Sequence, residues 1–170
     1  NNIKNYFDDI NGYKPEIVNH LDPKFIQPLE VHTYKSGDQV SKRKWVIEGT
    51  CIAGAVTLYV GPGGAGKTTI GSQLCYSEVT GTKFFGKTVY VTGNALMIIQ
   101  EETRNEANLK LRALEEQFGS LEHCKNKIDL ITIEKNIKLT HFKPDGTVTV
   151  LNDYHGLKKL IQKNKYKLIY

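Results

Sequence analysis

Four residues at fixed spacing, Gly61, Gly66, Lys67 and Thr68, complete the G-x-x-x-x-G-K-[ST] pattern of a phosphate-binding loop. Glycine has no Cβ atom, so the backbone of such a loop can adopt positive φ angles and approach a phosphate closely. The amides from about Gly63 to Thr68 are then expected to point inward and to hold an anion. The pattern therefore predicts binding of a nucleoside triphosphate.

Each polar group of this loop has a separate expected task. A helix that begins near Lys67 adds the positive end of its dipole and its unpaired N–H groups. The Lys67 ammonium is expected to reach the β- and γ-phosphates, and the Thr68 hydroxyl is expected to bind Mg²⁺. The predicted nucleotide-binding residues are Gly61, Pro62, Gly63, Gly64, Ala65, Gly66, Lys67, Thr68 and Thr69.

The loop needs a strand before it and a helix after it, and the neighbouring residues predict both. Val56, Leu58 and Val60 alternate with other residues, which is typical of a short strand that leads into the loop. The following helix is predicted to end at Gly81, a residue type that commonly caps helix C-termini.

A pair of adjacent carboxylates, Glu101 and Glu102, is the second feature that could do chemistry. The apolar run before it, residues 95–100, predicts a strand buried on both faces, and open α/β sheets place ligands at the C-terminal ends of such strands. Hydrolysis needs a carboxylate that orients and deprotonates water, so both acids are candidate catalytic residues together with Lys67. Adjacent side chains diverge, so one acid is expected to face the nucleotide. In the alternative interpretation, both acids only favour the dipole of the next helix.

Helix and strand patterns alternate along the rest of the chain. Thr103 and Glu106 form a capping box before a helix that is predicted to end at Gly119. A turn signal at residues 143–146 predicts a β-hairpin. This alternation predicts an α/β fold, a three-layer core with a mostly parallel central sheet. Further strands are predicted over residues 128–133, 139–142, 147–151 and 167–170, and a brief β-like piece is predicted over residues 88–91.

Composition limits the remaining possibilities. The chain has 170 residues, of which 39% are hydrophobic and 24% charged, as in ordinary globular domains. No apolar run approaches the roughly 20 residues of a membrane-spanning helix, and no signal peptide opens the chain. The three cysteines have no paired spacing, so we expect a cytoplasmic protein with reduced thiols and no membrane partner. The histidines lack ligand spacing, so Mg²⁺ is the only expected metal.

Two segments are predicted. Residues 1–44 contain three prolines that interrupt any long periodicity, and they are interpreted as an N-terminal arm or linker. Residues 45–170 are predicted to form the nucleotide-binding domain. The chain begins without methionine and stops within an apolar run, so we expect it to be a fragment of a longer protein.

The segments GPGGAGKTT, TGTKFFGK and LMIIQEETRNEANLKLRAL, in this order, resemble the RecA-like core of RepA-type ATPases. These are ring-forming helicases of plasmid, phage and mobile-element replication. A more distant similarity is to KaiC- and RadA-type ATPases. The resemblance covers roughly residues 45–170. It implies ATP and Mg²⁺ as ligands, single-stranded DNA as a partner, and assembly into a homo-oligomeric ring that is expected to be a hexamer.

Carried over to this chain, the resemblance assigns Lys67 to charge neutralisation, Thr68 to Mg²⁺ and Glu101 to the activation of water. Lys110 stands where RepA-like sequences often have an arginine. Residues 168–170 resemble the strand before the Walker B aspartate, so the chain is expected to stop just before that residue and to hydrolyse ATP poorly by itself.

Three alternatives remain open. The first is a KaiC- or RadA-like regulatory or recombination ATPase. The second is a small-molecule kinase, which would use a lid of arginines, although Arg104 and Arg112 are the only arginines after the loop. The third is a nucleotide-binding module without catalysis.

Overall fold

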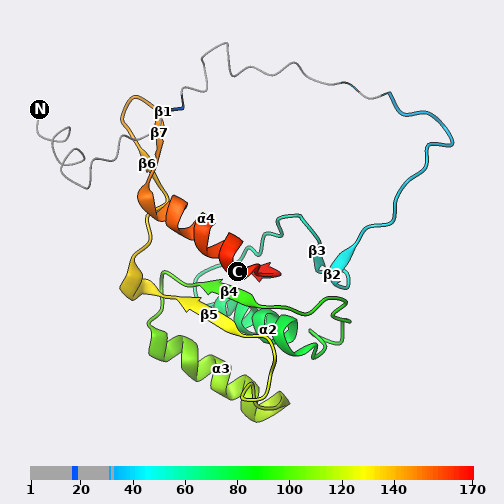
Figure 1. The fold of residues 1–170 in the computed structure, drawn as a ribbon, viewed down its shortest axis with the longest axis vertical. Helices are drawn as coiled ribbons and strands as arrows, with labels where there is room; N and C mark the ends of the chain where they lie inside the picture. The colour runs from blue at the N-terminus through cyan, green and yellow to red at the C-terminus, as the bar shows by residue number, and fades with distance from the viewer. Residues whose placement is uncertain (1–16, 19–30, 32) are drawn as a thin grey trace, which may run out of the picture. The chain divides into compact units, whose positions relative to one another are not determined.

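The computed structural model describes residues 17–18, 31 and 33–170 (Figure 1), so most of the predicted N-terminal arm lies outside the described residues. The chain divides into two compact units, which are described separately. One comprises residues 41–137 and 161–170. The other comprises residues 138–160 and the described residues before position 41.

A three-stranded parallel sheet forms the centre of the first unit. Strand β4 (Ala95–Ile98) lies between β5 (Ile128–Ile131) and β8 (Leu168–Ile169) and pairs in parallel with both. The first three residues of β4 are fully buried, as the continuous apolar run predicts. The prediction of an α/β fold with a parallel central sheet flanked by helices is therefore confirmed.

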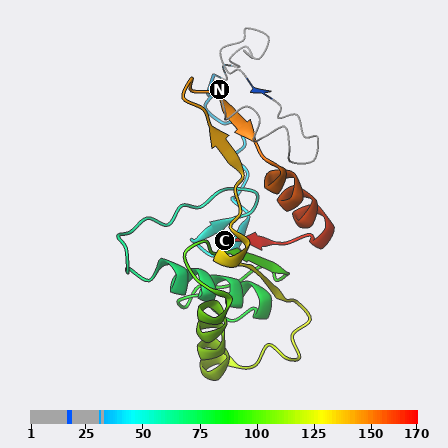
Figure 2. The ribbon, with the colours of Figure 1, turned by 90° about the vertical axis from the view of Figure 1, so that its left-hand side faces the viewer.

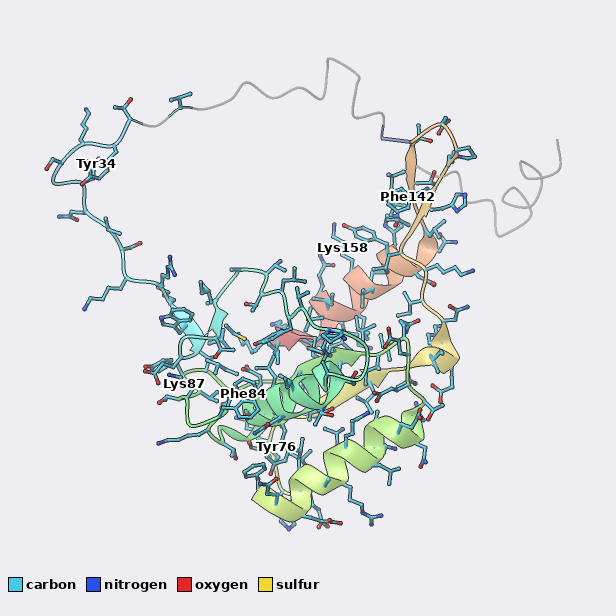
Figure 3. The ribbon with its side chains drawn as sticks, turned by 180° about the vertical axis from the view of Figure 1, so that it is seen from behind. Tyr34, Tyr76, Phe84, Lys87, Phe142 and Lys158 are labelled. Atoms are coloured by element: carbon cyan, nitrogen blue, oxygen red, sulfur yellow. The ribbon has the colours of Figure 1, made fainter. Side chains whose placement is uncertain are left out.

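Two helices of similar length accompany this sheet. Helix α2 (Lys67–Thr80) packs against β4 and against α3 (Arg104–Phe118) (Figure 1). The hydroxyl of Tyr76 on α2 donates a hydrogen bond to the Gly119 carbonyl at the end of α3, 2.5 Å away (Figure 3). The two helices end at Gly81 and Gly119 as predicted. The buried residues at the centre of this core are Cys75, Val79, Ala95, Met97, Ile99 and Ala107.

The start of α3 confirms the predicted capping box. The Glu106 N–H donates to the Thr103 hydroxyl at 3.3 Å, and the Thr103 N–H donates to the Glu106 carboxylate at 2.7 Å. Two N–H groups that helix geometry leaves unpaired are thus satisfied by neighbouring side chains.

The brief β-like piece predicted over residues 88–91 pairs with β2 (Trp45–Ile47) through an isolated bridge and does not extend to a full strand. Strands β2 and β3 (Cys51–Ile52) form a separate antiparallel pair, and Val89 makes only an isolated bridge to Ile47. Two backbone hydrogen bonds flank this bridge, from the Tyr90 N–H to the Val46 carbonyl and from the Glu48 N–H to the Thr88 carbonyl, before the chain turns at Gly49 with φ 66°.

Residues 55–60 also do not form the predicted strand. Val56, Leu58 and Val60 are 98%, 82% and 85% exposed. Figure 2 shows this stretch as part of an extended loop between β3 and α2. Alternating apolar residues meet only one requirement of a strand. The other is a neighbour that takes the backbone hydrogen bonds, and no strand in the described part of the chain pairs with these residues.

Strand β5 is shorter than the predicted stretch of residues 128–133. It ends at Ile131, and a 3₁₀ turn, η2 (Ile133–Lys135), follows. The Ile133 N–H donates to the carbonyl of Glu102 at 3.2 Å and not to a strand neighbour, because the chain bends here toward the segment after β4.

The second unit contains the predicted hairpin. Strands β6 (Thr140–Phe142) and β7 (Val148–Val150) pair in antiparallel fashion, and β1 (Ile17–Val18) pairs with the other edge of β7. Helix α4 (Asn152–Asn164) follows the hairpin. None of the described helices is long and apolar enough to cross a membrane.

Candidate functional site

The glycine-rich loop enters α2 through two left-handed backbone positions. Gly64 has a φ of 74° and Gly66 a φ of 80°. A Cβ atom at either position would meet nothing within 4 Å. Glycine is therefore needed there for its backbone conformation and not for space, since residues with a side chain rarely adopt this region.

The start of α2 is left open. Gly66 is the cap residue, and no side chain caps the helix or places a negative charge in its first turn. The first helical hydrogen bond runs from the Ile70 N–H to the Gly66 carbonyl. The N–H groups of Lys67, Thr68 and Thr69 precede that bond, and they lie where the helix dipole is positive. Such a helix start favours the binding of an anion.

The Lys67 side chain curls back over the loop. Its ammonium donates hydrogen bonds to the carbonyls of Gly61, at 3.0 Å, and Pro62, at 2.8 Å. An ammonium has three donor hydrogens, so two of them are used by the loop itself. A positive charge thus lies beside the open start of α2, where a phosphate would be held.

The two threonines after Lys67 offer oxygen ligands. Thr68 is partly buried and Thr69 is exposed, and neither hydroxyl has a hydrogen-bond partner within the described residues. No group of three His, Cys, Asp or Glu residues that could hold a metal occurs there either. A hydroxyl at the open helix start suits Mg²⁺, which prefers oxygen ligands and binds proteins through few side chains together with phosphates. The residues therefore fit a nucleotide-bound magnesium ion.

The adjacent carboxylates after β4 have different surroundings. The Glu102 carboxylate forms an ion pair with the Lys110 ammonium at 2.5 Å, and these side chains are 18% and 29% exposed. Glu101 is exposed, and it has no hydrogen bond or ion pair with any other described residue. The two side chains thus diverge as expected. Lys110 binds Glu102, and Glu101 remains available.

Tyr170 contacts the first turn of α2 and lies within electrostatic range of these acids. Its hydroxyl donates a hydrogen bond to the Lys67 carbonyl at 2.9 Å, in the first turn of α2. Burial raises the pKa of Tyr170, and the nearby groups of Cys75, Glu102 and Glu101 raise it further. Both acids therefore lie close to a side chain that touches the start of α2.

The sequence prediction included Tyr170 only as part of a strand. The one signal that points to its contact with α2 is a glycine in the interior of that helix, Gly71, where a side chain is otherwise expected.

A family model described as AAA domain matches residues 22–170. The matched stretch includes the glycine-rich loop, α2, the carboxylate pair and all three strands of the parallel sheet. No curated protein and no solved structure was found to match the chain.

Proposed function

Because the chain belongs to the AAA_25 family of AAA domains, which are RecA-like P-loop ATPases, we propose that it is the ATP-binding part of a RepA-type DNA helicase. Family membership implies that it binds and hydrolyses a nucleoside triphosphate. The helicase role, the single-stranded DNA partner and the homo-oligomeric ring go further and rest on the sequence resemblance. We assign ATP binding to residues 45–170 and the role of an arm to residues 1–44.

The observation that carries nucleotide binding is the uncapped start of α2 with the Lys67 ammonium beside it. On binding, the ammonium exchanges the carbonyls of Gly61 and Pro62 for phosphate oxygens. The exchange is favourable because hydrogen bonds between charged partners are stronger than those to neutral carbonyls. The backbone N–H groups of residues 63–69 hold the same phosphates.

We assign the Thr68 hydroxyl as the protein ligand of the magnesium ion. When bound, Mg²⁺ supplies charge neutralisation at the β- and γ-phosphate oxygens. The hydroxyl is free to take this role, since no other described residue binds it.

Glu101 is the residue to which we assign activation of the attacking water. It accepts a proton from water as the water oxygen bonds to the γ-phosphorus, and the bond from phosphorus to the leaving ADP oxygen breaks. Glu102 is less suited, because its carboxylate already forms an ion pair with the Lys110 ammonium. We assign Glu102 a supporting position.

The test is ATP turnover by the protein in its full natural length, with and without single-stranded DNA, beside Glu101→Gln and the matched variant Glu102→Gln. We expect DNA to stimulate turnover, Glu101→Gln to abolish it while ATP still binds, and Glu102→Gln to retain most of it. Turnover that ignores DNA but depends on Glu101 would favour a KaiC- or RadA-like regulatory ATPase. ATP binding without turnover in the wild type would indicate a non-catalytic module.

A further inference from the structure

Tyr170 occupies the space that a side chain at position 71 would need. A Cβ atom added to Gly71 would lie within 2.6 Å of three ring carbons of Tyr170, closer than real Cβ atoms approach any neighbour. Gly71 is not among the glycines with positive φ, so its backbone conformation does not require glycine. The ring does. Glycine inside a helix costs roughly 1 kcal/mol relative to alanine, and this close approach is what that cost permits.

The Tyr170 ring is held from two sides. Its own backbone continues the pairing of β8 with β4, because its N–H donates to the Leu96 carbonyl at 2.9 Å and its carbonyl accepts from Ile98 at 2.8 Å. Its hydroxyl donates to the Lys67 carbonyl. The side chain also packs against both hydrophobic clusters of this unit. Tyr170 is therefore a short, fixed connection between the central sheet and α2.

This connection reaches the helix at the turn that binds phosphate. Lys67 and Gly71 are four residues apart and so lie on the same face of α2. Any group that pushes the ring away from Gly71 must also move the helix start or break the hydrogen bond to Lys67. Either change displaces the Lys67 ammonium and the Thr68 hydroxyl relative to the carboxylates, which belong to the sheet side of the site.

We propose that Gly71 and Tyr170 form a positioning pair, which sets the location of the phosphate-binding start of α2 relative to Glu101. The role rests on the proposed ATPase function. Neither residue touches the nucleotide in this proposal, and both act through Lys67 and Thr68.

The test is a double-mutant cycle of Gly71→Ala, Tyr170→Ala and the double variant in the full-length protein. The kcat and KM for ATP and the urea unfolding curve are measured for each. Gly71→Ala should lower kcat by about 10- to 100-fold, because misplacement of reacting groups by about 1 Å has effects of this size. The effect on KM should be smaller. In the Tyr170→Ala background the added methyl group has room, so Gly71→Ala should change kcat by less than about twofold, and the effects should be strongly non-additive.

Gly156 in α4 provides a matched control, because it is an exposed helical glycine whose added Cβ would meet nothing within 4 Å. Gly156→Ala should stabilise the protein slightly and leave kcat unchanged. Should Gly71→Ala fail to fold, Tyr170→Phe keeps the ring and removes only the hydroxyl, and it should still lower kcat more than it raises KM.

The outcomes separate the two proposals. Equal effects of Gly71→Ala in both backgrounds, or normal kcat in Gly71→Ala and Tyr170→Phe, would overturn the positioning role while leaving the ATPase function intact. A wild-type protein that neither binds nor turns over ATP would contradict the proposed function and the positioning role with it.

Discussion

Helices α2 and α3 pack on each other and differ by one residue in length, 14 against 15, yet they begin in opposite ways. The start of α3 is completed by the side chains of Thr103 and Glu106. The start of α2, at Gly66, has no side-chain cap. A helix that serves only packing gains from satisfying its own N–H groups, whereas open N–H groups are retained where a ligand completes them. The contrast supports the proposal that α2 is the helix that binds the nucleotide.

The last turns of the two helices also differ, in whether a carboxylate there has a hydrogen-bond partner. Glu115 near the end of α3 accepts a hydrogen bond from the Leu121 N–H at 2.7 Å. Glu78 near the end of α2 is fully buried, and neither of its carboxylate oxygens has a partner within the described residues. Burial raises the pKa of Glu78 to about 7, although the positive charge of Lys167 acts in the opposite direction. The backbone at the end of α2 is capped at Gly81, but this end carries a buried carboxylate without a partner among the described residues, which the end of α3 does not.

The largest expected effect comes from removing the positive charge beside the open start of α2. Lys67→Met should lower ATP turnover about 10²- to 10³-fold, the usual effect of removing one preorganised donor from a reacting anion. Steady-state turnover at saturating ATP measures it. Glu106→Ala is the matched change at the start of α3 and should leave turnover within about twofold. Normal turnover in the Lys67 variant would mean that the open start of α2 is not the site.

Glu78→Gln tests the end of α2. Because the pKa of Glu78 is about 7 in the folded protein against an ordinary 4.5, the folded state holds this proton more tightly than the unfolded state. The corresponding stability is complete below pH 4.5 and is lost as the pH rises through 7, by at most about 3 kcal/mol. Glutamine does not ionise, so the variant should be more stable than the wild type at pH 8 and nearly equal to it at pH 4.5.

Urea unfolding curves at several pH values measure this difference. The charged group that acts on Glu78 is Lys167, just before β8, and Glu78 in turn raises the pKa of the Cys51 thiol on β3 and of the Cys75 thiol on α2. Glu115→Gln is the control on α3, and it should bring no gain at pH 8 because its carboxylate already has a donor. A stability gain for Glu78→Gln that is the same at pH 4.5 and pH 8 would exclude ionisation as its cause.

Gly66→Asp converts the open start of α2 into a closed one. Aspartate tolerates the left-handed backbone better than most residues, and its carboxylate would interact with the N–H groups and the dipole that the phosphate needs. The ATP dissociation constant should rise about tenfold or more. Titration with a fluorescent ATP analogue measures it. Gly66→Asn has nearly the same shape without the charge and should weaken binding less. Equal losses in the two variants would show that backbone strain, and not anion competition, is responsible.

The smallest expected effect comes from opening α3. Thr103→Ala removes the hydroxyl that accepts from the Glu106 N–H and donates to the Glu106 carboxylate, and it should lower the free energy of unfolding by about 1 kcal/mol. ATP affinity should stay within about twofold, because α3 does not bind the nucleotide in the proposed mechanism. Thr103→Ser retains the cap oxygen and should recover most of the stability. A clear loss of ATP affinity in Thr103→Ala would remove the functional distinction between the two helices.

The features that were predictable from the sequence are the local ones. The helix after Lys67, its end at Gly81, the capping box at Thr103 and the buried strand from Ala95 each depend on residues within a few positions of one another. The spacing of the phosphate-binding residues belongs to the same class. Local hydrogen bonding and short-range periodicity are sufficient to specify such elements.

The features that escaped prediction depend on contacts that spacing in the sequence does not reveal. Residues 55–60 have strand-like alternation but no neighbouring strand in the described structure. The pairing of Glu102 with Lys110 decides which acid is available, and spacing alone does not reveal it. Tyr170 and Gly71, which lie against each other, are 99 positions apart in the sequence. Such contacts follow from tertiary packing and not from local pattern.

Five of the six residues 55–60, AVTLYV, are exposed, and only Tyr59 packs partly against the core. This segment contains no charge and no proline, and its β-branched and aromatic residues favour extended structure. Short segments of this composition stack readily with identical copies of themselves when they are accessible. With Val56, Leu58 and Val60 largely exposed, concentrated solutions of this chain should lose material to aggregation through this segment. We therefore expect the solubility of the chain to depend on a six-residue segment directly before the phosphate-binding loop.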